Sequence, residues 1–129
     1  MKRAVFLTLA SGIALAVGAF ALVAPSTLLA SKGISSAAAG VWVREVGVLL
    51  VAVGISVFMV RHHGDSPTLR ALLIGNLVVQ LGLLPVEVLA YREGTITVLA
   101  GIVPNTLIHG LLACGFGYYA WAMPKLHPA

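Results

Sequence analysis

The sequence predicts an all-α integral membrane protein, a bundle of four transmembrane helices that forms a single domain over residues 1–129. Hydrophobic residues make up 60% of the chain and charged residues only 9%, and the mean hydropathy is +1.04. Soluble globular proteins carry about 25% charged residues. The apolar residues also form long blocks rather than short alternating runs, which favours helices in a bilayer over a soluble core or an outer-membrane barrel.

Four apolar blocks are long enough to cross a hydrocarbon core, which takes about 20 helical residues. They cover residues 4–24, 41–60, 69–91 and 96–122. Asp65, Ser66 and Pro67 give the third helix a clear start, because Ser66 is placed to cap it and proline is favoured at the first helical position. Pro104 leaves two alternatives for the last block: one long helix, or an outer loop with a short re-entrant turn followed by a span from about 105 to 122.

The basic residues are distributed unevenly about this topology. Five fall on the side of the termini: Lys2, Arg3, Arg61, Arg70 and Lys125. Two fall in the opposite loops, Lys32 and Arg92, and Arg44 lies just inside the membrane there. The positive-inside rule therefore predicts that both termini face the cytoplasm. The net charge of +4 does not predict a nucleic-acid surface, because the basic residues are scattered and lie mostly where the apolar blocks end.

The first 24 residues also fit a secretory signal peptide, since they have a basic start and small residues near a candidate cleavage site. The apolar run is, however, longer than the 7–15 or so residues usual in signal peptides. The length favours a retained first span.

Small residues at helical spacing indicate where the helices would pack, because membrane helices associate through close backbone approach. The first block has Ala4, Ser11, Ala14, Gly18 and Ala21 at such steps, and the fourth has Gly110, Ala113, Gly117 and Ala120. In the second block one face carries Arg44, Gly47, Val51, Gly54, Phe58 and Arg61, and it includes Gly40 if the helix begins that early.

Arg44 shares its face with Gly47 and Gly54, which predicts that it points into the bundle. The alternative is that Arg44 extends to the outer headgroups, as basic residues near helix ends commonly do. Glu45 lies about 100° further round the helix, and it either pairs with Arg44 or sits at the outer interface.

The third block carries a polar stripe of Asn76, Gln80 and Glu87, which lie within about 40° of one another on a helix. Pro85 frees a backbone carbonyl near Glu87. The fourth block adds Asn105 and His109, four residues apart and so on one face. Glu87 and Arg44 should lie at a similar depth in the outer part of the membrane, so they are plausible partners. Gln80 and His109 should lie nearer the middle of the membrane.

We therefore expect an outward-opening polar site between the helices. Its candidate ligand-binding residues are Arg44, Glu45, Asn76, Gln80, Glu87, Asn105 and His109. An ionisable residue inside the membrane is by default a hypothesis for a functional site. An alternative is that these groups only hold four helices in register, since interhelical polar contacts are common in membrane proteins.

We expect no metal site, and no cofactor is indicated. His109 has no second intramembrane histidine to form an axial pair, and His62 and His63 fit a solvated turn better than a metal site. The single cysteine, Cys114, excludes an internal disulfide and a CxxC motif. No sequence-local catalytic motif is present, so no catalytic residue is assigned. Glu87 and His109 would nevertheless suit proton transfer from two different helices.

The stretches REVGVLLVAVGISVFMVR, where an arginine opens the second helix and two glycines follow seven apart, and LRALLIGN resemble the DoxX-like group of small bacterial four-helix membrane proteins. The resemblance covers residues 1–122 in architecture. It implies a multi-pass protein of the bacterial inner (cytoplasmic) membrane. Some members of that group are accessory subunits of membrane redox complexes, such as thiosulfate:quinone oxidoreductase, and many have no assigned role.

Two other four-span families fit less well. The eicosanoid and glutathione membrane proteins look similar at RALLIGN, but they place a glutamate shortly after the asparagine, where this chain has Val78, Val79 and Gln80. The emopamil-binding proteins also use intramembrane carboxylates, but this chain is short for them.

Two functional hypotheses follow. The first is an accessory or structural subunit of a membrane complex, with other subunits or further copies of itself as partners in the lipid bilayer, whose polar cluster binds a small lipid or quinone-like molecule. The second is a membrane enzyme or carrier in which Arg44 holds an anionic group while Glu87 and His109 move protons. Neither involves nucleic acid.

Overall fold

A computed structural model gives the fold and describes residues 1–124. Its elements are α1 (Arg3–Val23), α2 (Pro25–Ser31), α3 (Ala37–Val60), α4 (Pro67–Arg92), the short 3₁₀ helix η1 (Leu99–Gly101) and α5 (Val103–Ala122). Within the described residues the fold is all-helical, and four of its helices are long and apolar enough to cross a membrane. The predicted all-α fold class and the four long apolar helices are confirmed.

The structure has one helix that was not expected, and it decides between the two alternatives for the last block. Residues 25–31, expected to be loop, form α2, which begins with Pro25 at its first turn. Of the two alternatives for the last block, the broken one is present, because α5 begins at Val103 with Pro104 in its first turn, after the loop and η1. Proline is tolerated there because first-turn amides have no intrahelical acceptor.

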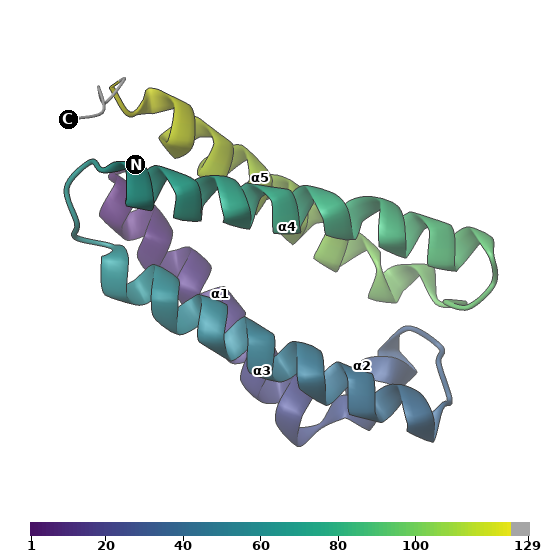
Figure 1. The fold of residues 1–129 in the computed structure, drawn as a ribbon. Helices are drawn as coiled ribbons and strands as arrows, with labels where there is room; N and C mark the ends of the chain where they lie inside the picture. The colour runs from purple at the N-terminus through teal and green to yellow at the C-terminus, as the bar shows by residue number, and fades with distance from the viewer. Residues whose placement is uncertain (125–129) are drawn as a thin grey trace.

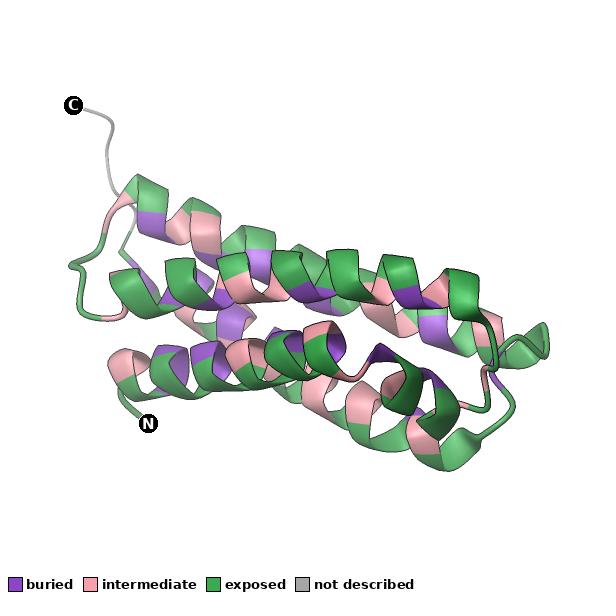
Figure 2. Cartoon of the chain, turned by 90° about the horizontal axis from the view of Figure 1, so that it is seen from below, coloured by how far each residue is buried: buried purple, intermediate pink, exposed green. Residues whose placement is uncertain are grey.

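The long helices form two antiparallel pairs, α1 with α3 and α4 with α5 (Figure 1). The beginning of α1 and the end of α5 lie at one end of the molecule, and α2 lies at the other (Figure 1). The first of these is called the end that holds the termini below. Buried residues face the neighbouring helices, whereas the outward surfaces are largely exposed (Figure 2). Many of the exposed side chains are large and apolar, among them Leu49, Met59, Val78 and Leu111.

The predicted small-residue faces of α1 and α3 pack against each other. A Cβ on Gly18 would lie 2.9 Å from the backbone oxygen of Gly47, and a Cβ on Gly47 would lie 2.9 Å from the oxygen of Gly18. A Cβ on Gly54 would lie 2.8 Å from Leu15 Cγ. These separations leave no room for a side chain, so the glycine face of α3 sets the distance between the two helices.

The glycine face predicted for the fourth span is only partly used. A Cβ on Gly110 would meet nothing within 4 Å, and one on Gly117 would make ordinary contact with Leu77 at 3.8 Å. The tight position is instead Gly115, which faces the ring of Phe6 on α1. Packing of α5 against α1 therefore depends on a glycine outside the predicted seam.

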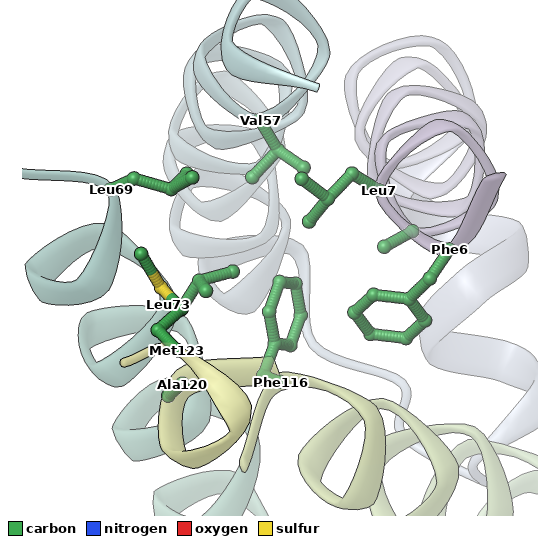
Figure 3. Packing of buried hydrophobic residues seen from close by; sticks show 9 residues of the cluster. Phe6, Leu7, Val57, Leu69, Leu73, Phe116, Ala120 and Met123 are labelled. Carbon is green, nitrogen blue, oxygen red and sulfur yellow. The ribbon is translucent and has the colours of Figure 1, made fainter. Parts of the chain in front are cut away.

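An apolar cluster joins the two pairs at the end that holds the termini (Figure 3). Its buried members come from α1, α3, α4 and α5 and the residue after α5: Phe6, Leu7, Ala10, Val57, Leu69, Leu73, Phe116, Ala120 and Met123. Phe6 and Phe116 pack edge to face with ring centroids 5.0 Å apart. This cluster is the main contact between the two helix pairs at that end.

Polar contacts close the same end. Ser66 caps α4, as predicted, by accepting a hydrogen bond from Leu69 N at 3.1 Å. Arg3 forms an ion pair with Asp65, which ties α1 to the α3–α4 loop. The guanidinium of Arg70 donates to the carbonyl oxygens of Met123 and Pro124, at 2.7 and 2.6 Å, so it holds the end of α5.

The opposite end is closed by its two loops. The backbone amides of Thr97 and Val98 both donate to the carbonyl oxygen of Lys32, at 3.1 and 3.3 Å. The next residue, Gly33, has a φ of +75°, which side-chain-bearing residues rarely adopt. Gly101 packs against the backbone of Ser31. The segment after α2 and the segment before α5 are therefore joined, and this junction positions the polar residues described next.

Candidate functional site

Glu87 is the centre of the polar cluster between α4 and α5. Its side chain is 8% exposed, and its Oε1 accepts a hydrogen bond from Asn105 Nδ2 at 2.7 Å. The same oxygen forms an ion pair with the ammonium of Lys32. The second oxygen, Oε2, is buried and has no hydrogen-bond partner among residues 1–124. A buried acceptor of this kind costs free energy unless some other group donates to it.

Lys32 reaches Glu87 because of how its own segment folds. It ends α2, and its carbonyl is held by Thr97 and Val98 of the opposite loop. Its side chain is 21% exposed, so it extends inward from the end of the molecule. The ion pair thus joins the half of the molecule that contains α1, α2 and α3 to the half that contains α4 and α5.

Gln80 and His109 make a second polar contact between α4 and α5. His109 Nδ1 lies 2.5 Å from Gln80 Oε1. Gln80 is seven residues before Glu87 and His109 is four residues after Asn105, so each pair shares one face of its helix. The polar faces predicted on the third and fourth spans therefore do meet.

Asn76 is buried but bonds within its own helix. Its Nδ2 donates to the carbonyl oxygen of Leu72 at 2.9 Å. It lies one turn before Gln80 on the same side of α4. Asn76 therefore extends the polar stripe toward the apolar cluster. Its hydrogen bond stays within α4 and does not join α4 to another helix.

Arg44 and Glu45 lie away from this cluster. Both are exposed, and neither forms an ion pair within residues 1–124. The expected pairing of Arg44 with Glu87 is wrong, because Lys32 occupies that position. The physical reason is that α3 packs against α1 and α2, whereas α4 packs against α5. Glu45 likewise does not pair with Arg44.

Arg44 instead lines an open pocket of about 420 Å³ between α2 and α3. It shares this pocket with Gly40 of the same helix face and with side chains from residues 25–37. Arg44 shares the face of Gly40, Gly47 and Gly54, but its side chain is exposed and does not point into the bundle as expected. That face meets α2 near its beginning and α1 further along.

Lys32 is the residue of the cluster that sequence reasoning did not include among the site residues. The topology predicts an outer loop for Lys32. One signal was available, since Lys32 is the only charged residue between Arg3 and Arg44. A single cation in a long uncharged stretch near a membrane carboxylate is a candidate partner for it.

The cluster supplies a carboxylate, two amides, an imidazole and an ammonium group in a mostly apolar setting. Such groups can hydrogen-bond a polar headgroup and accept or donate protons. Within residues 1–124 no three His, Cys, Asp or Glu residues are grouped so that they could hold a metal ion. His62 and His63 are exposed, and the carbonyl of His63 accepts from Arg3 at 2.8 Å.

Comparison with models of known protein families, with curated proteins and with solved structures finds no match.

Proposed function

We propose that this chain is a small multi-pass membrane protein of the DoxX-like kind, which acts as an accessory or structural subunit of a membrane complex and binds a small quinone-like molecule at its polar cluster. The observation that supports ligand binding most directly is the buried, unpartnered Oε2 of Glu87. The proposal puts the headgroup of the ligand beside this oxygen.

A quinol fits this acceptor chemically. Its hydroxyl group would donate to Glu87 Oε2, and the amide of Asn105 and the ring of His109 would supply further polar contacts along α5. Glu87 could then accept a quinol proton, since a carboxylate at hydrogen-bond distance from a hydroxyl is positioned as a general base. The isoprenoid tail would lie along apolar side chains of the helices.

Exposed glycines support a subunit role. Gly75 and Gly82 of α4 are exposed, lie seven residues apart and have nothing within 4 Å of an added Cβ. Small residues at this spacing allow a second helix to approach closely in lipid. The proposal assigns this face of α4 to contact with another subunit or a second copy.

The location proposed is the bacterial inner membrane with both termini in the cytoplasm. Lys2, Arg3, Arg61 and Arg70 all lie toward the end that holds the termini, and the positive-inside rule puts that end in the cytoplasm. The exposed apolar surface of the four long helices supports insertion in a bilayer.

We do not extend the proposal to an enzyme or carrier that uses Arg44, Glu87 and His109 on one substrate. Arg44 lines the α2–α3 pocket, whereas Glu87 and His109 belong to the α4–α5 cluster.

Native mass spectrometry of the protein, extracted gently from its own membrane, tests both parts of the proposal. A larger assembly would support the subunit role, and a free monomer without retained molecules would contradict it. For the ligand, the protein is incubated with a short-chain quinol, and its retention is compared between the wild type, Glu87→Gln and the control Glu93→Gln in the exposed loop.

We expect Glu87→Gln to lose about 10- to 150-fold in affinity, since a hydrogen bond to a charged group contributes about 1.5–3 kcal/mol. Glu93→Gln should keep the affinity of the wild type. His109→Ala tests the other end of the cluster without removing the partner of Lys32. If Glu87→Gln and His109→Ala both bind the quinol as the wild type does, the cluster has only a packing role.

A further inference from the structure

A second place in the structure has the features of a binding site, and it is separate from the Glu87 cluster. The pocket of about 420 Å³ between α2 and α3 lies within the volume range of ligand sites, about 300–1,000 Å³. One wall is apolar, with Leu29 and Ile34, and the other side carries Arg44. Neither the packing of the helices nor the proposed quinol site explains this arrangement.

The charge of the pocket is positive and uncompensated. Arg44 is its only charged lining residue, and the guanidinium forms no ion pair within residues 1–124. A guanidinium presents its N–H donors as a planar fork that matches the oxygens of a phosphate. The pocket therefore favours an anionic phosphate group, and it lacks a carboxylate that would receive the ammonium of a zwitterionic headgroup.

Further donors surround the same space. Three serines line it: Ser26, Ser35 and Ser36. Ser36 caps α3 by accepting from Ala39 N at 3.3 Å, which leaves its hydroxyl proton available to donate. Ala37, the first residue of the 24-residue helix α3, also lines the pocket, and first-turn amides have no intrahelical acceptor.

The position of Arg44 along α3 suits a lipid. It lies seven residues after Ala37, or about 10 Å along the helix axis. Trp42, at nearly the same level, is 67% exposed, and tryptophan is enriched where membrane and water meet. Exposed apolar side chains such as Val48 and Ile55 continue along α3 from there. A phosphate at Arg44 could thus keep its acyl chains against the helix.

We propose that the α2–α3 pocket binds one anionic phospholipid through its phosphate group, with the Arg44 guanidinium as the main contact and the serine hydroxyls as secondary donors. The short helix α2 forms one side of this open pocket, and the beginning of α3 forms the other. The proposal thus gives α2 a function besides the placement of Lys32.

The test is native mass spectrometry of the purified protein in detergent with added phosphatidylglycerol or phosphatidylcholine. We expect the wild type to retain one phosphatidylglycerol in preference to phosphatidylcholine. Arg44→Gln should lower the affinity for phosphatidylglycerol about tenfold or more, as expected for the loss of a charge-assisted contact. Arg92→Gln is the matched control, because it removes the same charge from an exposed position at the same end of the molecule.

A second variant keeps the charge and fills the pocket. Gly40 lines the pocket, and an added Cβ there meets nothing within 4 Å, so Gly40→Leu should fold and still exclude the lipid. Circular dichroism and gel filtration would verify the fold of each variant. Loss of preference in both Arg44→Gln and Gly40→Leu, with Arg92→Gln unchanged, is the expected result.

Three results would overturn the proposal. One is equal retention of both lipids by the wild type. Another is an equal loss in Arg44→Gln and Arg92→Gln, which would indicate general charge attraction. The third is displacement of the lipid by inorganic phosphate at a concentration similar to that of the lipid, which would make the pocket a site for free phosphate and not for a lipid headgroup.

Discussion

Lys32 and Glu87 form an ion pair across 55 positions of the chain, and with it they join the α1–α2–α3 half of the molecule to the α4–α5 half at the end opposite the termini. Glu87 is almost fully buried and Lys32 largely so. The carboxylate of Glu87 also accepts a hydrogen bond from Asn105, so α5 is joined to the same contact.

Removal of one partner of this pair should destabilise the protein more than removal of both. Lys32→Met leaves the Glu87 carboxylate buried without its counter-charge, which costs about 3–5 kcal/mol for a buried pair. In the double variant Lys32→Met/Glu87→Leu that charge is absent, so much of the stability should return. Thermal unfolding in detergent of the wild type, both single variants and the double variant gives the coupling energy. Strictly additive losses would show that the two side chains do not interact.

The close contact of α1 with α3 should tolerate no side chain at Gly47. Gly47→Ala would place a Cβ 2.9 Å from the backbone oxygen of Gly18, so the helices must move apart and the melting temperature should fall. Gly12→Ala is the control, since its Cβ would meet nothing within 4 Å. That variant should be neutral or more stable by up to about 1 kcal/mol, because alanine is the better helix former. A Gly47→Ala protein as stable as Gly12→Ala would contradict the packing described.

Gly115 and Gly117 should respond differently although they are two residues apart on α5. Gly115→Ala would push against the ring of Phe6, a buried member of the apolar cluster, and overpacking of that kind costs about 1–3 kcal/mol. Gly117→Ala would make only ordinary contacts, with Trp121 at 3.4 Å and Leu77 at 3.8 Å. Chemical denaturation under the same conditions compares the stability of the two variants directly. We expect Gly115→Ala to be less stable than Gly117→Ala.

Arg70 should stabilise the end of α5. Its guanidinium donates to the carbonyls of Met123 and Pro124, which lie just past the last residue of the helix. Arg70→Met keeps an apolar side chain of similar length but removes these donors, and the loss should be about 1–3 kcal/mol. Hydrogen exchange of residues 118–122 should rise in this variant and stay unchanged in the control Arg92→Met. Unchanged exchange in both variants would show that the contact does not hold the helix end.

The sequence by itself determined the features that depend on local periodicity and local chemistry. Four apolar stretches predicted the long helices, Ser66 and Pro67 predicted the start of α4, and the glycines at 47 and 54 predicted the packing face of α3. The polar faces of α4 and α5 followed from the spacing of Gln80 with Glu87 and of Asn105 with His109. Such features could be read because a helix repeats every 3.6 residues, whatever it later packs against.

Only the tertiary structure decided which residues meet across the molecule. It put Lys32 on Glu87 in place of Arg44, formed α2, left Arg44 in a separate pocket and made Gly115 the tight contact of α5 instead of Gly110. These outcomes depend on which helices pair and on how the two end loops bond to one another. Residues more than 50 positions apart are brought together by that packing, and no local pattern in the chain specifies it.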